Sequence, residues 1–126
     1  MKSKIHLAVV LAIAMTMFAQ QSQPMRQYLV LIKRGPKWLA GKSVAEQPLL
    51  EHGKYLKELM DKGTLQLAGP FLDDSGGFVI LNAADDAEAR RIAEHDPGVI
   101  SQIIEPEVRP IRIAFDAATG KSPFSR

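Results

Sequence analysis

The run Tyr28-Leu29-Val30-Leu31-Ile32 has no polar residue between its first and last positions. An uninterrupted apolar run of this length predicts a β-strand that is covered on both faces. The run Phe78-Val79-Ile80-Leu81 has the same character. Two such strands belong in the interior of a sheet, where neighbouring strands and packed layers shield them from water.

Two further segments, 64–68 and 108–113, alternate apolar with polar residues and predict strands that are covered on one face. Pro110 interrupts the second segment, and because proline cannot donate to a strand ladder, that segment is expected at an edge. The turn residues 73–77 join segment 64–68 to the apolar run 78–81, which predicts an antiparallel hairpin.

Two amphipathic helices are predicted between these strands. Pro48 suits a first helical position and Gly63 suits the end of the same helix. Asp85 and Glu88 have the spacing of a capping box that opens a second helix, and Pro97 stops it. The inward stripes are Leu49, His52, Leu56, Leu59 and Met60 on the first helix, and Ala89, Ile92, Ala93 and Asp96 on the second.

The element order is therefore βαββαβ, which predicts an α+β ferredoxin-like fold with an antiparallel sheet of order 4-1-3-2. Two helices cover only one face of such a sheet. The apolar residues on the other face need a cover, and a second copy of the same sheet supplies one. We therefore expect a homodimer that pairs through its sheet faces, the arrangement of a dimeric α/β barrel.

The N-terminus has the pattern of a secretory signal peptide. Lys2 and Lys4 precede an apolar run at residues 5–18, and Ala19 is the best cleavage point. This predicts an exported, periplasmic or secreted protein without stable membrane association, with an uncleaved anchor as the alternative. The predicted organisation is a signal peptide at 1–19, a linker at 20–27, a domain at 28–113 and a flexible tail at 114–126.

Composition excludes several classes of partner and chemistry. Removing residues 1–19 takes away two lysines and leaves 14 basic against 14 acidic residues, so no basic surface for nucleic acid is expected. Without cysteine there is no disulfide and no lipid-modified cysteine. No cofactor motif is present, and no third histidine or cysteine at ligand spacing supports a metal site.

His52 and Asp96 are the ionisable residues on the two inward stripes. Since both helices lie on one face of the sheet, the two side chains are candidates for a catalytic pair. A carboxylate that accepts one imidazole N–H fixes the tautomer and leaves the other nitrogen free to accept a proton. Two other interpretations stay open. His52 is a structural residue at the edge of the core whose ring nitrogens have hydrogen-bond partners, and Asp96 caps a short turn from Pro97 to Ile100.

Trp38 lies in a long loop at 35–47, which either closes over a pocket or packs against the body or a second subunit. Gly69 and Pro70 are candidate pocket residues, although together with 76–77 they are interpreted first as turns rather than a phosphate loop. His95 is expected to face outward, and Tyr55 has no evident partner.

The segment from His52 to Gly63, the stretch Leu67-Ala68-Gly69-Pro70 and the Asp96-Pro97 pair resemble the YCII-related (YciI-like) family. The resemblance continues through Gly76-Gly77, 87–89 and 108–110 and covers roughly residues 28–113. It implies a ferredoxin-like α/β fold, dimers built by stacking sheets, and a site centred on His52 and Asp96. Some members of this family act as dehydrochlorinases on chlorinated hydroxyquinols.

The chain departs from the family pattern in its 35–47 loop, in Gly98 where members often carry a bulky residue, and in its export signal. The resulting hypothesis is a small-molecule lyase or hydrolase that needs no cofactor, with His52 as general base and Asp96 as its orienting partner. The alternatives are a non-catalytic module that binds a small ligand and a monooxygenase-type dimeric α/β barrel.

Overall fold

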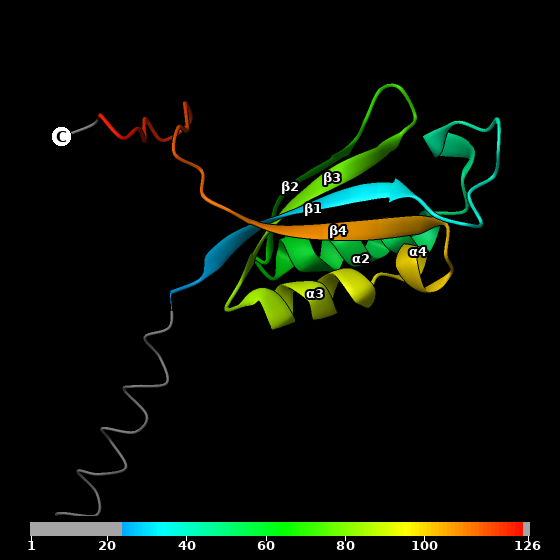
Figure 1. The fold of residues 1–126 in the computed structure, drawn as a ribbon, viewed down its shortest axis with the longest axis horizontal. Helices are drawn as coiled ribbons and strands as arrows, with labels where there is room; N and C mark the ends of the chain where they lie inside the picture. The colour runs from blue at the N-terminus through cyan, green and yellow to red at the C-terminus, as the bar shows by residue number, and fades with distance from the viewer. Residues whose placement is uncertain (1–23, 125–126) are drawn as a thin grey trace, which may run out of the picture.

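The computed structural model describes residues 24–124. The predicted signal peptide, the first half of the predicted linker and the last two residues lie outside this range. Residues 24–124 form a four-stranded sheet, and Figure 1 shows the labelled α-helices on one side of it. Within residues 24–124 no helix is both long enough and apolar enough to cross a membrane.

The element order confirms the predicted βαββαβ fold. The strands are β1 Arg26–Arg34, β2 Leu65–Pro70, β3 Gly76–Ala83 and β4 Ile104–Ile111, and they form an antiparallel sheet of order β2-β3-β1-β4. The helices are α2 Leu50–Asp61, α3 Asp86–Glu94 and the short α4 Pro97–Ile100, with a 3-10 helix η1 at Val44–Glu46. The fold is thus the predicted α+β ferredoxin-like one.

The core lies between the sheet and α2 and α3. β1 and β3 pair from Arg26 to Lys33 of β1, and their helix-facing side chains are buried. These side chains are Tyr28, Val30 and Ile32 on β1, and Val79, Leu81 and Ala83 on β3. The two fully apolar runs therefore occupy the interior of the sheet, as predicted.

β4 differs from its prediction in extent. It begins at Ile104, four residues before the predicted start at Val108, because it pairs with β1 as far as Arg34. Pro106 falls within this extension and hid the strand signal, yet an edge strand accepts proline where an N–H would face solvent. The predicted edge position is confirmed, since β4 pairs only with β1.

The first helix begins later than predicted. α2 starts at Leu50, and Pro48 belongs to the turn before it, where Gln47 adopts the extended backbone usual before proline. Met60, predicted on the inward stripe, is 50% exposed because it is rotated past the buried Leu59. Gly63 ends the helix with a positive φ of 76°, as predicted.

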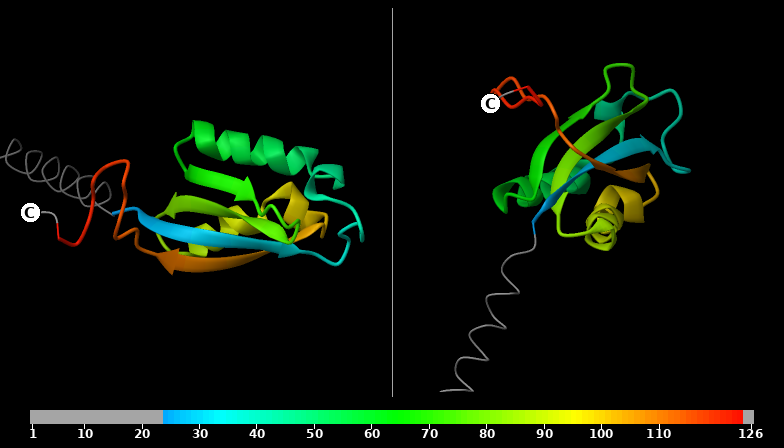
Figure 2. Two further views of the ribbon diagram at one scale, coloured as in Figure 1. Left: turned by 90° about the horizontal axis from the view of Figure 1, so that it is seen from above. Right: turned by 60° about the vertical axis from the view of Figure 1, so that its left-hand side comes forward.

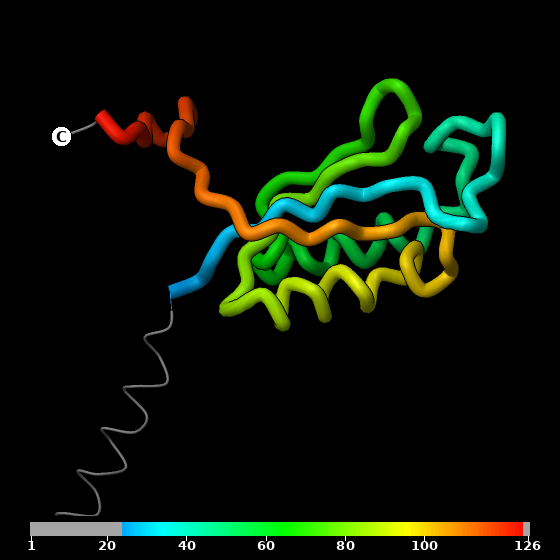
Figure 3. The backbone as a smooth tube through the Cα atoms, in the orientation of Figure 1, coloured from blue at the N-terminus to red at the C-terminus, as the bar shows by residue number. Residues whose placement is uncertain are grey.

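The two ends of the sheet carry different segments of the chain, as Figure 3 shows most simply. The chain termini leave from one end. At the other end the 35–47 loop, the β2–β3 turn and α4 come together. Figure 2 shows from two further directions that no helix or strand of residues 24–124 covers the sheet face opposite the helices.

Candidate functional site

A cavity of about 250 Å³ lies at the loop end of the molecule, between the sheet and the start of α2. The sheet and its hairpin contribute Ile32, Ala68, Gly69, Pro70, Gly76, Gly77, Phe78 and Ile104. The helix side and the loop contribute Trp38, Val44, Leu49, His52 and Leu56. The lining is therefore almost entirely apolar, and His52 supplies its one ionisable side chain among these residues.

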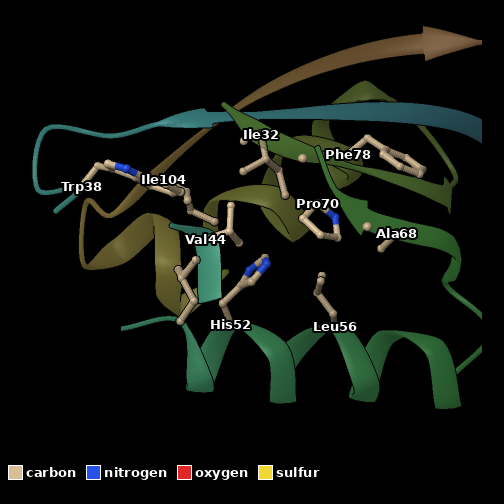
Figure 4. Close-up of a pocket in the computed structure, with 13 residues that line it drawn as sticks. Ile32, Trp38, Val44, His52, Leu56, Ala68, Pro70, Phe78 and Ile104 are labelled. Atoms are coloured by element: carbon tan, nitrogen blue, oxygen red, sulfur yellow. The ribbon is translucent and has the colours of Figure 1, made fainter. Parts of the chain in front are cut away.

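His52 reaches the cavity from the first turn of α2. Figure 4 shows the imidazole pointing away from the helix toward the sheet, between Val44 and Pro70. Its side chain is 15% exposed, so it is largely shielded from bulk water. Nδ1 of His52 lies 2.6 Å from Oδ2 of Asp96, which confirms the predicted contact between the two stripes.

Asp96 performs both tasks that the sequence left open. It is buried, with 5% of its surface exposed, and it is the N-cap of α4 with Pro97 at the first helical position. Its Oδ1 accepts a hydrogen bond of 2.8 Å from the Gly98 N–H, while Oδ2 faces His52. The cap fixes the carboxylate, and the fixed carboxylate then orients the imidazole.

This geometry selects one neutral tautomer of His52. A carboxylate has only acceptor sites, so Nδ1 carries the hydrogen and donates it to Oδ2. Nε2 then holds a lone pair, and it has no hydrogen-bond partner among residues 24–124. The arrangement can accept a proton from a molecule in the cavity and stabilise the resulting imidazolium through Asp96.

Tyr55 has a partner that sequence reasoning missed. Its hydroxyl donates a 2.7 Å hydrogen bond to the backbone oxygen of Ile92, which joins α2 to α3 one turn from the His52–Asp96 contact. Burial raises the pKa of Tyr55, and the negative charge of Asp96 raises it further. Helical spacing alone places Tyr55 on the flank of α2 and does not reveal a backbone acceptor on another helix.

Trp38 lines the cavity and also packs against the hydrophobic core. The predicted contact with a pocket and the predicted packing against the body are therefore both found. The Arg34 guanidinium lies over the Trp38 ring, 5.5 Å from its centroid. His95 faces outward as predicted, and its Nδ1 lies 2.6 Å from the Arg91 backbone oxygen.

Gly69, Pro70, Gly76 and Gly77 form one wall of the cavity. The interpretation of these residues as turns was wrong, because they lie in the paired ends of β2 and β3. A Cβ on Gly77 would stand 2.6 Å from the Gly69 oxygen, so the strands approach each other too closely for a side chain. Turn chemistry in the sequence masked this close approach.

Gly98 explains one departure from the family pattern. A Cβ at this position would lie 2.9 Å from Cδ1 of Ile104 and 3.1 Å from Cδ2 of Leu49. Both neighbours line the cavity. The glycine therefore allows α4 to pack closely enough for its N-terminus to hold Asp96 beside His52.

Metal ligands are not grouped in the part of the chain that the structure describes. Within residues 24–124 no group of three or more His, Cys, Asp or Glu side chains could hold a metal ion.

Fold and site together define a small ferredoxin-like α+β domain with a histidine–carboxylate pair in the wall of an apolar cavity. The model of the YCII-related domain matches residues 26–112, and the chain belongs to this family. The match confirms the resemblance described above and nearly reproduces its predicted limits of 28–113.

A similar solved structure is that of the 5-chloro-2-hydroxyhydroquinone dehydrochlorinase (TftG) from Burkholderia phenoliruptrix AC1100, in complex with 2,5-dihydroxybenzoquinone. It is 25% identical to this chain with a TM-score of 0.55, and the alignment covers 68% of this chain and 93% of that one. A search of curated proteins finds no match. The chain is thus similar over most of the relative's length to an enzyme with a small cyclic ligand.

Proposed function

We propose that this protein is an enzyme that uses His52 as a general base on a small cyclic or aromatic compound. The observation that carries the proposal is the 2.6 Å contact between Nδ1 of His52 and Oδ2 of the buried Asp96, in the wall of an apolar cavity. The other carboxylate oxygen of Asp96 accepts a hydrogen bond from the Gly98 N–H. The contact leaves Nε2 as the proton acceptor. A positioned base of this kind contributes roughly a hundredfold to ten-thousandfold in rate.

The cavity supports a substrate with one ring. Its volume of about 250 Å³ is below the roughly 300–1,000 Å³ typical of pockets for drug-sized ligands. An apolar lining favours a neutral ring over a charged one, because burying an unpaired charge is costly. One hydroxyl directed at His52 would satisfy the polar group of the cavity and present the proton to be removed.

Elimination is the reaction that this site and the dehydrochlorinase relative support best. In a halogenated hydroquinone, the proton of one hydroxyl first moves to the neighbouring ring carbon that bears the halogen, which makes that carbon tetrahedral and turns the hydroxyl into a carbonyl. Nε2 of His52 then removes the proton of the para hydroxyl, the electron pair of that O–H bond forms a second carbonyl, and the adjacent ring double bond shifts to the halogen-bearing carbon. The halide leaves with the electrons of the carbon–halogen bond, so the substrate loses one hydrogen halide and becomes a quinone. The proton on His52 then passes to solvent. Hydrolysis, with water as the species deprotonated, is the other reaction that this base supports.

Chloride release from a panel of chlorinated hydroquinones tests the proposal. We expect turnover by the wild type and a loss of roughly a hundredfold to ten-thousandfold in His52→Gln. His95→Gln is the matched control, because His95 is exposed and lies outside the cavity lining. Equal activity in His52→Gln and the wild type would refute the general base. Binding without turnover across the panel would make the domain a ligand-binding module.

We also propose that two copies pair through the sheet faces that the helices leave open. Leu29, Leu31, Phe78 and Ile80 are partly exposed on that face, as their register with the buried helix-facing residues requires. Leu67 on the neighbouring β2 is 60% exposed. A continuous apolar surface over central strands is typical of an interface, and a twofold copy would bury it.

We also propose that the protein is exported and acts in the periplasm or outside the cell. The support is the pair Lys2 and Lys4 followed by the apolar run at residues 5–18, a pattern typical of secretory signals. Cell fractionation with N-terminal sequencing of the recovered protein tests it. A mature chain that begins after Ala19 in an exported fraction is expected, and a cytoplasmic protein that retains Met1 would contradict it.

A further inference from the structure

The 35–47 loop is held at three places, of which the first and third join it to the body of the protein and the second is internal to the loop. At its start, the N–H groups of Gly35 and Lys37 donate 2.9 Å hydrogen bonds to the backbone oxygens of Ile103 and Gln102. At its end, Gln47 is buried, with 7% of its surface exposed. The Gln47 amide accepts from the Leu39 N–H at 2.8 Å and donates to the backbone oxygens of Leu39 and Lys42.

Asp74 provides the third attachment, from the turn between β2 and β3. Its Oδ1 accepts a 3.0 Å hydrogen bond from the N–H of Val44, the first residue of η1. Its backbone oxygen accepts two hydrogen bonds, of 3.0 and 2.8 Å, from the Arg34 guanidinium that also lies over Trp38. Asp74 has a φ of 61°, a left-handed conformation that aspartate tolerates better than most residues.

These contacts join two walls of the catalytic cavity. The loop carries Trp38 and Val44, while the hairpin that contains Asp74 carries Gly69–Pro70 and Gly76–Gly77. Figure 4 shows Val44 and Pro70 on either side of His52. Because Asp74 holds the loop wall to the hairpin wall, it sets the distance between them and therefore the width of the cavity.

We propose that the 35–47 loop is a fixed wall that restricts the site to single-ring compounds, with Asp74 as the positioning residue for this size selection. The proposal rests on the proposed function in placing the substrate beside His52. It assigns the loop to substrate selection rather than to opening and closing. It also predicts which change would admit a ligand with two fused rings.

Binding of para-chlorophenol and of a chloronaphthol tests the wall. Trp38 is the only tryptophan in the chain, so its single indole N–H resonance reports binding in an NMR titration without any turnover. In the wild type we expect para-chlorophenol to bind at least about tenfold more tightly than the two-ring compound, the discrimination that small steric differences produce. In Asp74→Ala this preference should fall to about one.

Three further variants make the result specific. Asp74→Asn keeps an oxygen acceptor for the Val44 N–H and should retain the preference of the wild type. Asp73→Asn removes the adjacent charge and should also leave the preference unchanged, because the side chain of Asp73 accepts its hydrogen bonds from Ser75 in the same turn and not from the loop. Val44→Ala shortens the wall without removing its N–H and should admit the chloronaphthol even if Asp74→Ala does not fold.

Size selection by the loop is refuted if the wild type binds both compounds equally or fails to bind para-chlorophenol. It is also refuted if Asp74→Ala or Val44→Ala folds and still binds para-chlorophenol more tightly than the chloronaphthol, as the wild type should. Failure of the proposed function is distinguishable from these outcomes. If the size preference depends on Asp74 but chloride release does not depend on His52, the proposed size selection by the loop stands and the proposed general base is refuted. If chloride release depends on His52 but the size preference does not depend on Asp74, only the size selection is refuted.

Discussion

Replacing Asp96 by asparagine separates the two tasks of this side chain. Asparagine has nearly the same shape, and its Oδ1 can still accept the hydrogen bond from the Gly98 N–H. In place of Oδ2, however, the His52 ring faces an NH₂ group, which donates and does not accept. Nδ1 of the imidazole must therefore accept a hydrogen bond, so the hydrogen of the neutral ring lies on Nε2 instead of on Nδ1.

The magnitudes follow from these contacts. The retained cap and the new hydrogen bond to Nδ1 should limit the loss in the free energy of unfolding to about 1 kcal/mol. Asp96→Ala loses the cap, worth about 1 kcal/mol, and a hydrogen bond to a charged group, worth about 1.5–3 kcal/mol. A base locked in the wrong tautomer loses about four orders of magnitude in rate in serine proteases. We expect a comparable loss in Asp96→Asn despite its near-normal stability.

Nitrogen NMR of the imidazole ring checks the tautomer without a substrate. The wild type should show hydrogen on Nδ1 and none on Nε2 at a pH where the ring is neutral, and Asp96→Asn should show the reverse. His95 provides an internal reference, because its Nδ1 lies 2.6 Å from the Arg91 backbone oxygen and is not paired with the Asp96 carboxylate. The reasoning is refuted if His52 has the same tautomer in both proteins, or if Asp96→Asn keeps full activity.

Three other features lead to separate predictions. Gly98→Ala introduces a Cβ into close contact with two cavity residues and should lower the free energy of unfolding by about 1–3 kcal/mol in denaturant titrations. An unchanged midpoint would contradict this. Burial raises the pKa of both Tyr28 and Tyr55 above 10.0, so the folded state holds these protons more tightly than the unfolded state. The stability that this supplies is fully present below pH 10.0 and should be lost as the pH rises through the folded pKa values. Tyrosinate absorbance that follows the same curve in folded and unfolded protein would exclude it. Leu31→Lys places a charge on the open sheet face and should convert a dimer to a monomer in sedimentation equilibrium, whereas Leu50→Lys, at a residue 72% exposed on α2, should not. A dimer that persists in Leu31→Lys would place the interface elsewhere.

Much of the fold was predictable because local patterns and tertiary burial agree. The apolar runs at 28–32 and 78–81 are central because both of their faces need cover, and Pro110 confines its strand to an edge. His52 and Asp96 could be paired for the same reason. Each is an ionisable residue on a predicted inward stripe, and the topology places both helices over one face of the sheet. Asp96 itself lies just beyond the end of α3, as the N-cap of α4, because α3 ends at Glu94 before Pro97 begins a new turn.

The features that were missed depend on contacts between distant segments. The hydroxyl of Tyr55 bonds a backbone oxygen 37 residues away, which no periodicity reports. Gly76 and Gly77 look like turn residues in sequence, but their place in β3 is determined by pairing with β1 and β2. Val44 lines the cavity because Asp74 holds η1 against the hairpin, an attachment that spans 30 residues.

The central claim is that a substrate hydroxyl meets Nε2 of His52 inside the apolar cavity. A crystal structure of the protein with para-chlorophenol tests it most directly. The account predicts the ring between Val44 and Pro70, with its hydroxyl oxygen within roughly 2.6–3.2 Å of Nε2 and the Asp96 contact intact. A phenol bound elsewhere, or bound here with its hydroxyl directed away from His52, would contradict the account.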